Sequence, residues 1–204
     1  MPLETLDETA RQILDAATRR FLHYGFKKTT MSEIAEDCNM STGNLYRYFP
    51  SKLDIAETFV RVLRREISDR LREIAEDKSL TPAQKLRRFF RHKLRVAYDR
   101  FHNNPKAFEL SAELITARPK IAMEWEANEG RILAGILTEG GKTGLFAFED
   151  PLWIARVIQN ATYRFTGPGL IYEGEFQELE AELNDVMKLV LAGFTLKSEK
   201  KAHS

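Results

Sequence analysis

The stretch from residue 29 to residue 52, TTMSEIAEDCNMSTGNLYRYFPSK, predicts two short helices joined by a tight turn. Thr30 is followed three residues later by Glu33, which is the spacing of a helix-capping box. Asn39 falls where the chain must reverse, and Asn is the non-glycine residue that best tolerates a left-handed backbone. Ser41 is a good N-cap for the second helix. Two helices of about two turns each, joined in this way, form a helix-turn-helix.

The outer face of the second helix carries no carboxylate, which is unusual in a chain with 30% charged residues. The face offers Thr42, Asn44, Tyr46 and Arg47, while Gly43 leaves the backbone uncovered. Phosphates repel carboxylates, whereas hydroxyl, amide and guanidinium groups bind phosphate oxygens or base edges. The pattern therefore favours contact with DNA over the alternative, a solvated corner between two helices.

Residues 13–60 resemble the N-terminal domain of the TetR family of bacterial transcriptional regulators. The matching pieces are Ile13-Leu14-Asp15-Ala16-Ala17, Phe21, Tyr24-Gly25-Phe26, Thr29-Thr30-Met31, Ile34-Ala35, Ser41-Thr42-Gly43-Asn44-Leu45-Tyr46 and Tyr48-Phe49-Pro50-Ser51-Lys52. Two departures are mild: Cys38-Asn39-Met40 stands where the family often has Ala-Gly-Val, and Arg47 stands where His is common. The resemblance covers a quarter of the chain and implies a DNA-binding regulator, which we expect to be a repressor that its effector releases.

Ten residues are candidates for contact with double-stranded DNA. We expect Thr42, Asn44 and Arg47 to read bases, because Arg favours guanine and Asn favours adenine. Thr30, Tyr48 and Lys52 are expected to hold phosphates, and Lys52 lies in the first turn of the next helix, where N–H groups also favour an anion. The complete predicted interface is Thr29, Thr30, Ser41, Thr42, Gly43, Asn44, Tyr46, Arg47, Tyr48 and Lys52.

The net charge of +1 gives little support to nucleic-acid binding by itself. Between residues 9 and 53 there are seven Lys and Arg residues against four Asp and Glu residues, a local charge of +3. One such module would hold few phosphates, so useful affinity requires two modules acting together. A homodimer is therefore part of the functional hypothesis.

The whole chain has the composition of a globular protein that stays in the cytoplasm. Of its 204 residues 43% are hydrophobic, and no apolar run approaches the roughly 18 residues that a membrane span needs. The first twenty residues are acidic and then amphipathic, so they do not form a secretory signal. The single cysteine, Cys38, is expected in the core of the helix-turn-helix.

The sequence predicts an all-α fold with two domains. A helix over residues 6–24 should cover the helix-turn-helix, giving a DNA-binding domain of residues 1–53. A connecting helix of about 51–76 should lead into a helical regulatory and dimerisation domain of residues 54–197, and residues 198–204 should form a frayed tail. Further helix starts are expected at Thr81-Pro82, Asn104-Pro105, Pro119, Asp150-Pro151 and about Gly174, with a helix end at Gly140-Gly141.

The last two predicted helices, 154–165 and 176–194, have apolar faces wide enough to pack against a second copy. They could equally close the core of their own subunit, and the pattern alone does not separate these alternatives. The resemblance implies that they pair with their symmetry mates. Such a dimer would present two recognition helices to a pseudo-palindrome, about 34–36 Å apart or somewhat more.

The middle helices of the chain carry more aromatic residues than their core-facing sides account for. These residues suggest a site for a small organic effector, because such sites are mostly apolar with a few polar groups that orient the ligand. Asn128 is the leading polar candidate, followed by Tyr163 and Glu113. The alternatives are that the aromatics belong to the core, that Asn128 bridges helices and that Glu113 is solvated. The predicted site comprises Leu86, Phe89, Phe90, Leu110, Glu113, Leu114, Met123, Trp125, Asn128, Trp153 and Tyr163.

Two other classes of protein remain as alternatives. An enzyme is disfavoured because the chain has neither a Gly-rich phosphate loop nor a G-x-S-x-G motif. Glu109 and Glu113 lie one helical turn apart, but no Glu-x-x-His motif accompanies them, so we predict no catalytic residue, no metal site and no cofactor. A protein-interaction module would display Leu, Ile or Met on the surface of Ser41 to Tyr48, where this chain displays small polar residues.

Overall fold

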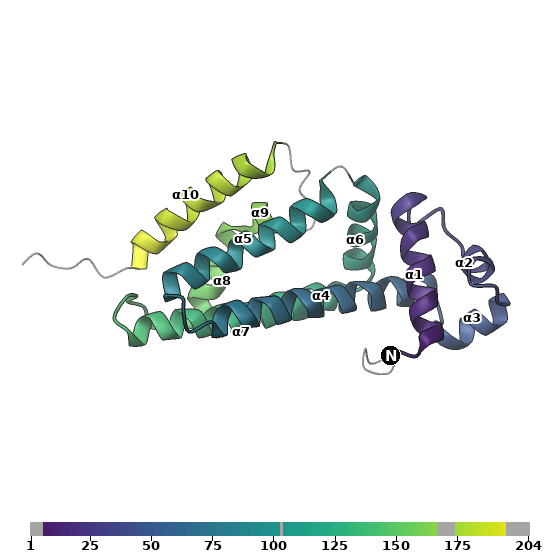
Figure 1. The fold of residues 1–204 in the computed structure, drawn as a ribbon, viewed down its shortest axis with the longest axis horizontal. Helices are drawn as coiled ribbons and strands as arrows, with labels where there is room; N and C mark the ends of the chain where they lie inside the picture. The colour runs from purple at the N-terminus through teal and green to yellow at the C-terminus, as the bar shows by residue number, and fades with distance from the viewer. Residues whose placement is uncertain (1–5, 103, 167–173, 195–204) are drawn as a thin grey trace, which may run out of the picture. The chain divides into compact units, whose positions relative to one another are not determined.

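The structure is a computed structural model that describes residues 6–102, 104–166 and 174–194. Over these residues the regular elements are helices, as predicted (Figure 1). Their bounds are α1 Glu8–His23, α2 Met31–Asp37, α3 Thr42–Tyr48, α4 Lys52–Glu76, α5 Pro82–Phe101, α6 Pro105–Ala117, α7 Pro119–Lys142, α8 Pro151–Ala161, α9 Tyr163–Thr166 and α10 Phe176–Phe194. None of the helices in the described ranges is long and apolar enough to cross a membrane. The predicted tail of residues 198–204 lies outside the described residues.

The described residues form two units. The N-terminal unit comprises residues 6–68 and 97–125, and the C-terminal unit comprises residues 69–96, 126–166 and 174–194. The N-terminal unit thus combines the predicted DNA-binding segment with α6, a helix from much later in the chain.

The helix starts follow the predicted capping residues. The Thr30 hydroxyl accepts the Glu33 N–H while the Glu33 carboxylate accepts the Thr30 N–H, so the capping box of α2 is complete. Asn104 and Asp150 cap α6 and α8, each with Pro in the first helical position. The first helix begins slightly later than predicted, because the Asp7 carboxylate accepts the Ala10 N–H at 2.8 Å and so caps α1.

The turn between α2 and α3 has the predicted left-handed residue. Asn39 has φ 53°, and the next N–H, that of Met40, donates to the Ala35 carbonyl at 3.0 Å. This bond closes the end of α2, and the left-handed residue redirects the chain into α3.

The core of the N-terminal unit joins the helix-turn-helix to α1 and α6. Cys38 is buried in this cluster, which confirms its predicted core position. The Phe21 and Phe26 rings pack edge to face with centroids 5.2 Å apart. The large members of the cluster are Ile13, Leu14, Phe21, Phe26, Met31, Ile34, Leu45, Phe49, Ile55 and Leu110. Leu110 is the only contribution from α6 among these buried residues.

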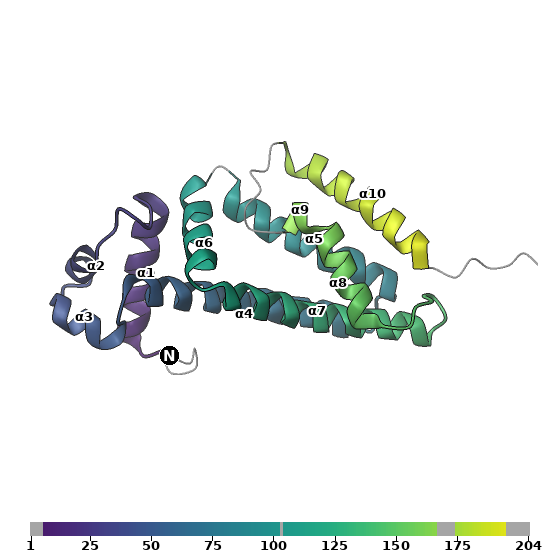
Figure 2. The ribbon, with the colours of Figure 1, turned by 180° about the vertical axis from the view of Figure 1, so that it is seen from behind.

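In the C-terminal unit, basic residues of α5 connect to the elements around it. Lys85 pairs with Glu139 of α7 at 2.6 Å, and Lys93 pairs with Glu129 of α7 at 2.6 Å. Arg91 pairs with Glu180 of α10, which runs alongside α5 in both views (Figures 1 and 2). Both members of the Lys93–Glu129 pair are almost fully buried, so this pair fixes the register of α5 against α7.

Two predicted helix ends are wrong. The helix that was expected to stop at Gly140-Gly141 continues to Lys142, and the Phe146 ring packs where a side chain at Gly140 would lie. The helix predicted over 154–165 is interrupted at Thr162, whose hydroxyl donates to the Ile158 carbonyl at 2.7 Å. The glycine at position 140 therefore allows the Phe146 ring to pack closely against α7. The buried Thr162 hydroxyl lies at the junction between α8 and α9.

We predict that Asn39→Ala lowers the free energy of unfolding of the N-terminal unit by about 1 kcal/mol, because alanine tolerates a left-handed backbone less well than asparagine. Asn39→Gly should keep the parent stability or raise it, since glycine adopts positive φ readily. Urea unfolding followed by circular dichroism measures both. Equal losses from alanine and glycine would show that the Asn39 side chain, rather than its backbone conformation, stabilises the turn.

Candidate nucleic-acid interface

α3 buries one face and exposes the predicted DNA-binding face. Leu45 within α3 and Phe49, which directly follows the helix, are buried in the core. The Ser41 hydroxyl accepts the Asn44 N–H at 3.2 Å, which caps the helix and fixes its start. Arg47 is exposed, Tyr46 is 49% exposed, and the space beside Gly43 is open. The helix therefore offers its polar residues to a partner without any carboxylate among them.

Thr29 and Thr30 occupy different environments. Thr30 is exposed beside the start of α2, where its hydroxyl also donates to Glu33 at 2.8 Å. Thr29 is buried, and its hydroxyl donates to the Gly25 carbonyl at 2.9 Å. The structure therefore places Thr30 at the predicted surface and Thr29 beneath it, where its hydroxyl holds the loop.

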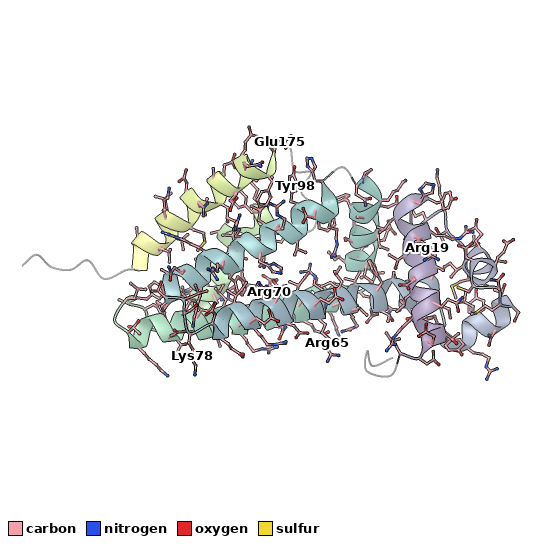
Figure 3. The ribbon with its side chains drawn as sticks, in the orientation of Figure 1. Arg19, Arg65, Arg70, Lys78, Tyr98 and Glu175 are labelled. Atoms are coloured by element: carbon pink, nitrogen blue, oxygen red, sulfur yellow. The ribbon has the colours of Figure 1, made fainter. Side chains whose placement is uncertain are left out.

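Arg20 of α1 pairs with two of the three acids of α2, a role that sequence reasoning missed. Its Nε and Nη2 donate to the two oxygens of Asp37 at 2.6 and 2.9 Å, and its Nη1 lies 3.3 Å from Glu33. The hydrogen bond from Arg20 is the main cause that lowers the pKa of Asp37, and the charge of Arg19, labelled in Figure 3, adds to it. The guanidinium group of Arg20 therefore reduces the repulsion that Asp37 and Glu33 would exert on a phosphate at the candidate interface.

Lys52 is already engaged with the protein backbone. Its Nζ donates to the Phe26 carbonyl at 2.5 Å and to the Thr29 carbonyl at 2.7 Å, and it lies 4.4 Å from the centre of the Phe26 ring. Burial lowers the pKa of Lys52. An ammonium group has three N–H donors, so one is left for the predicted phosphate.

α6 lies against α1 and the loop that follows α1. Glu113 pairs with Lys27 at 2.7 Å, and Glu109 accepts the Lys27 N–H at 3.4 Å. At the end of α6, Arg118 donates to Asp54 of α4 at 2.6 Å and pairs with Glu57 as well. Burial alone would raise the pKa of Asp54, but hydrogen bonds from Ser51 and Arg118 outweigh it and lower that pKa. Glu113 and Leu110, predicted for the effector site, therefore contact the elements that carry the interface.

The other predicted effector residues are divided within each unit between core and surface. In the N-terminal unit Leu114 is buried with Val60 and Ile121, Trp125 packs against them, and Met123 is exposed. In the C-terminal unit Leu86, Phe89 and Phe90 are fully buried, Asn128 is half-buried, and Trp153 and Tyr163 are about half exposed. Their role in effector binding stays a prediction.

Two family models match the chain. Residues 13–58 match the model described as bacterial regulatory proteins of the tetR family. Residues 82–187 match the model described as a tetracyclin repressor-like C-terminal domain. The first match covers α2 and α3, and the second covers most of the chain after α4.

Three of the similar proteins match most of the chain. The "Fatty acid metabolism regulator protein" of Bacillus subtilis is 26% identical over 184 residues, which cover 89% of this chain and 93% of that protein. The crystal structure of a TetR-family regulator from Mesorhizobium loti has a TM-score of 0.72 at 19% identity, and the match covers 92% of this chain and 97% of that one. The structure of FadR from Thermus thermophilus in complex with lauroyl-CoA has a TM-score of 0.63 at 20% identity, covering 96% and 100%. These structures have the same fold.

The phosphate contact of Lys52 can be tested through the salt dependence of DNA binding. Lys52→Met should weaken binding and reduce the slope of log affinity against log salt by about 0.9, the value for one lost phosphate contact. The control is Lys78→Met, which removes an exposed charge from the C-terminal unit (Figure 3) and should leave the slope unchanged. A weaker affinity with an unchanged slope would mean that Lys52 serves only to hold the carbonyls of Phe26 and Thr29.

Proposed function

Because the chain belongs to the TetR family of bacterial transcriptional regulators, we propose that it binds a pseudo-palindromic operator as a homodimer and that a small organic effector releases it. The observation that carries this proposal is the capped, carboxylate-free outer face of α3, held at the surface by Leu45 beneath it. In this proposal the protein is a repressor, like the relatives whose names describe repressors.

The proposed base contacts come from Thr42, Asn44 and Arg47. Arg47 is exposed and has no carboxylate partner among the described residues. Its guanidinium group is therefore available to donate to the O6 and N7 atoms of guanine. Thr30 and Tyr48, at the two ends of the helix-turn-helix, would hold phosphates and fix the orientation of α3. Thr29 is left out of the contact surface because its side chain is buried.

The proposed dimer uses α8 and α10. Ala155 and Ile158 of α8 are buried within the C-terminal unit, yet the other side of the helix exposes Leu152 at 58%, Trp153 at 51% and Val157. On α10, Leu189 is 77% exposed. Large apolar side chains gathered on one exposed helix face favour an interface, and a two-fold axis would make that patch contact its own copy. Two copies of α3 would then meet two half-sites.

The proposed effector has a substantial apolar part. The name of the Bacillus subtilis relative refers to fatty acid metabolism, and the Thermus thermophilus regulator was solved with lauroyl-CoA. A ligand that prefers the released form 100-fold supplies about 2.7 kcal/mol, which is enough to lose one half-site. α6, paired to Lys27 and to α4 through Arg118, is the element through which we expect the signal to reach the helix-turn-helix.

We predict that Arg47→Ala costs about 1–3 kcal/mol of operator binding and relaxes preference at one base pair. Selection from genomic fragments at about 150 mM salt, with parent and variant side by side, measures both effects. Arg72→Ala, which removes an exposed arginine of the C-terminal unit, is the control and should select the same sequence as the parent. A loss that is equal on all sequences would reassign Arg47 to phosphate. If the parent enriches no sequence, the DNA-binding function is wrong.

We predict that Val157→Glu dissociates the dimer and weakens operator binding at least tenfold, because it places two charges in the apolar patch across the two-fold axis. Analytical ultracentrifugation and a DNA titration report the two effects. Met123→Glu is the matched control, since Met123 is 68% exposed but belongs to the N-terminal unit. A Val157→Glu protein that remains dimeric would show that the interface lies elsewhere.

A further inference from the structure

Arg100 is a half-buried cation near the C-terminal end of α5, within the N-terminal unit. Among the described residues its guanidinium group has neither a hydrogen-bond acceptor nor a carboxylate within 4.0 Å, although the described ranges include many acids. A charged group taken partly out of water without a counter-ion is costly. Its retention therefore calls for an explanation.

Other arginines of the same unit show the usual solution. Arg118 pairs with Asp54 and Glu57, Arg61 donates to Glu57 at 2.7 Å, and Arg20 holds Asp37 with its fork. In these cases an acid lies beside the arginine and compensates its charge within the folded unit. Arg100 departs from that pattern.

A second arginine, Arg64, lies near enough to Arg100 to influence its pKa. Burial and the nearby charge of Arg64 lower the pKa of Arg100 to about 10, and Glu66 offsets this only in part. Arg64 comes from α4, its Nε atom is buried, and its guanidinium carbon lies 5.0 Å from the centre of the Trp125 ring of α7. Arg100 of α5, Arg64 of α4 and the Trp125 ring of α7 therefore belong to one region of the N-terminal unit.

Two further features of this region suit the binding of a ligand. Trp125 packs against the apolar cluster of Val60, Leu114 and Ile121, so an apolar surface borders the charged region. At the end of α5, the Nδ1 atom of His102 is buried and lacks a hydrogen-bond partner in the part of the chain that the structure describes. Guanidinium groups bind carboxylates and phosphates through two parallel hydrogen bonds.

We propose that Arg100 binds an anionic group of the effector, a carboxylate or a phosphate, while the apolar part of the effector lies toward Trp125. This inference rests on the proposed function, because it gives the effector its chemical class. Arg100 then meets its counter-ion only in the effector-bound protein. Neutral apolar compounds would gain nothing from this residue.

The test uses isothermal titration calorimetry of the full-length protein with both tryptophans kept. The protein is titrated with laurate, lauroyl-CoA and dodecan-1-ol. Laurate offers a carboxylate, lauroyl-CoA offers phosphates, and dodecan-1-ol is the neutral chain of the same length. We expect at least one anionic probe to bind with a tenfold or greater advantage over dodecan-1-ol, and the preferred probe identifies the anion.

Arg100→Gln should abolish that advantage, whereas Arg100→Lys should retain part of it because it keeps the charge. Arg87→Gln, which removes an exposed arginine from the same helix, is the matched control and should behave like the parent. Thermal unfolding of each variant verifies folding, and Arg100→Gln should not lower the midpoint, since no described partner is lost.

If no anionic probe binds more tightly than dodecan-1-ol, or if the advantage survives Arg100→Gln, the anion site is wrong. A markedly lower unfolding midpoint for Arg100→Gln would also overturn it, because Arg100 would then be a structural residue. Operator binding by the same parent sample is measured in parallel. Retained DNA binding together with a failed anion preference refutes only the effector class, while absent DNA binding refutes the regulator.

Discussion

The packing of α2 and α3 onto α1 is the constraint on which the interface depends. Each of these two helices has only seven residues, and isolated helices of that length are not stable in water. Their order must come from Ile34, Leu45 and Phe49, which bury against the Phe21 face of α1. Because these residues fill the inner side, Gly43, Tyr46 and Arg47 are left on the exposed side. The same packing that stabilises the helix therefore defines which residues can meet a partner.

Ion pairs then compensate several acids of the N-terminal unit. Three ion-pair groups are involved. They are Arg20 with Asp37 and Glu33, Lys27 with Glu113, and Arg118 with Asp54 and Glu57. Each pair also ties two elements together: α1 to α2, the loop after α1 to α6, and α6 to α4. A displacement of α6 would disturb two of these ties at once. The fold thus gives the helix-turn-helix a polar link to a helix that lies outside the DNA-binding segment of the sequence.

Local features of this structure could be predicted from the sequence, whereas long-range pairs could not. The capping box of Thr30, the left-handed Asn39 and the proline starts depend on neighbours within four residues, so the sequence contains all that determines them. The Arg20–Asp37 fork joins residues 17 apart and the Arg118–Asp54 pair residues 64 apart, and no periodicity indicates either. The burial of Thr29 involves a bond to the nearby Gly25 carbonyl that no periodicity indicates, and the continuation of α7 through Gly140 depends on the packing of the Phe146 ring. The outward face of α3 was predictable because the core side of a short helix is set by its few large apolar residues.

The charges of α5 differ in a way that stability alone does not explain. Lys85 and Lys93 are almost completely buried, and each has a glutamate of α7 at 2.6 Å, so burial and compensation go together in the C-terminal unit. Arg100, on the same helix, is half-buried and has no such partner among the residues that the structure describes. A protein selected only for stability would replace it, since an apolar residue or a paired charge would cost less. A regulator has a different requirement: its free and liganded forms must differ in free energy, and a cation whose counter-ion arrives with the ligand creates that difference directly.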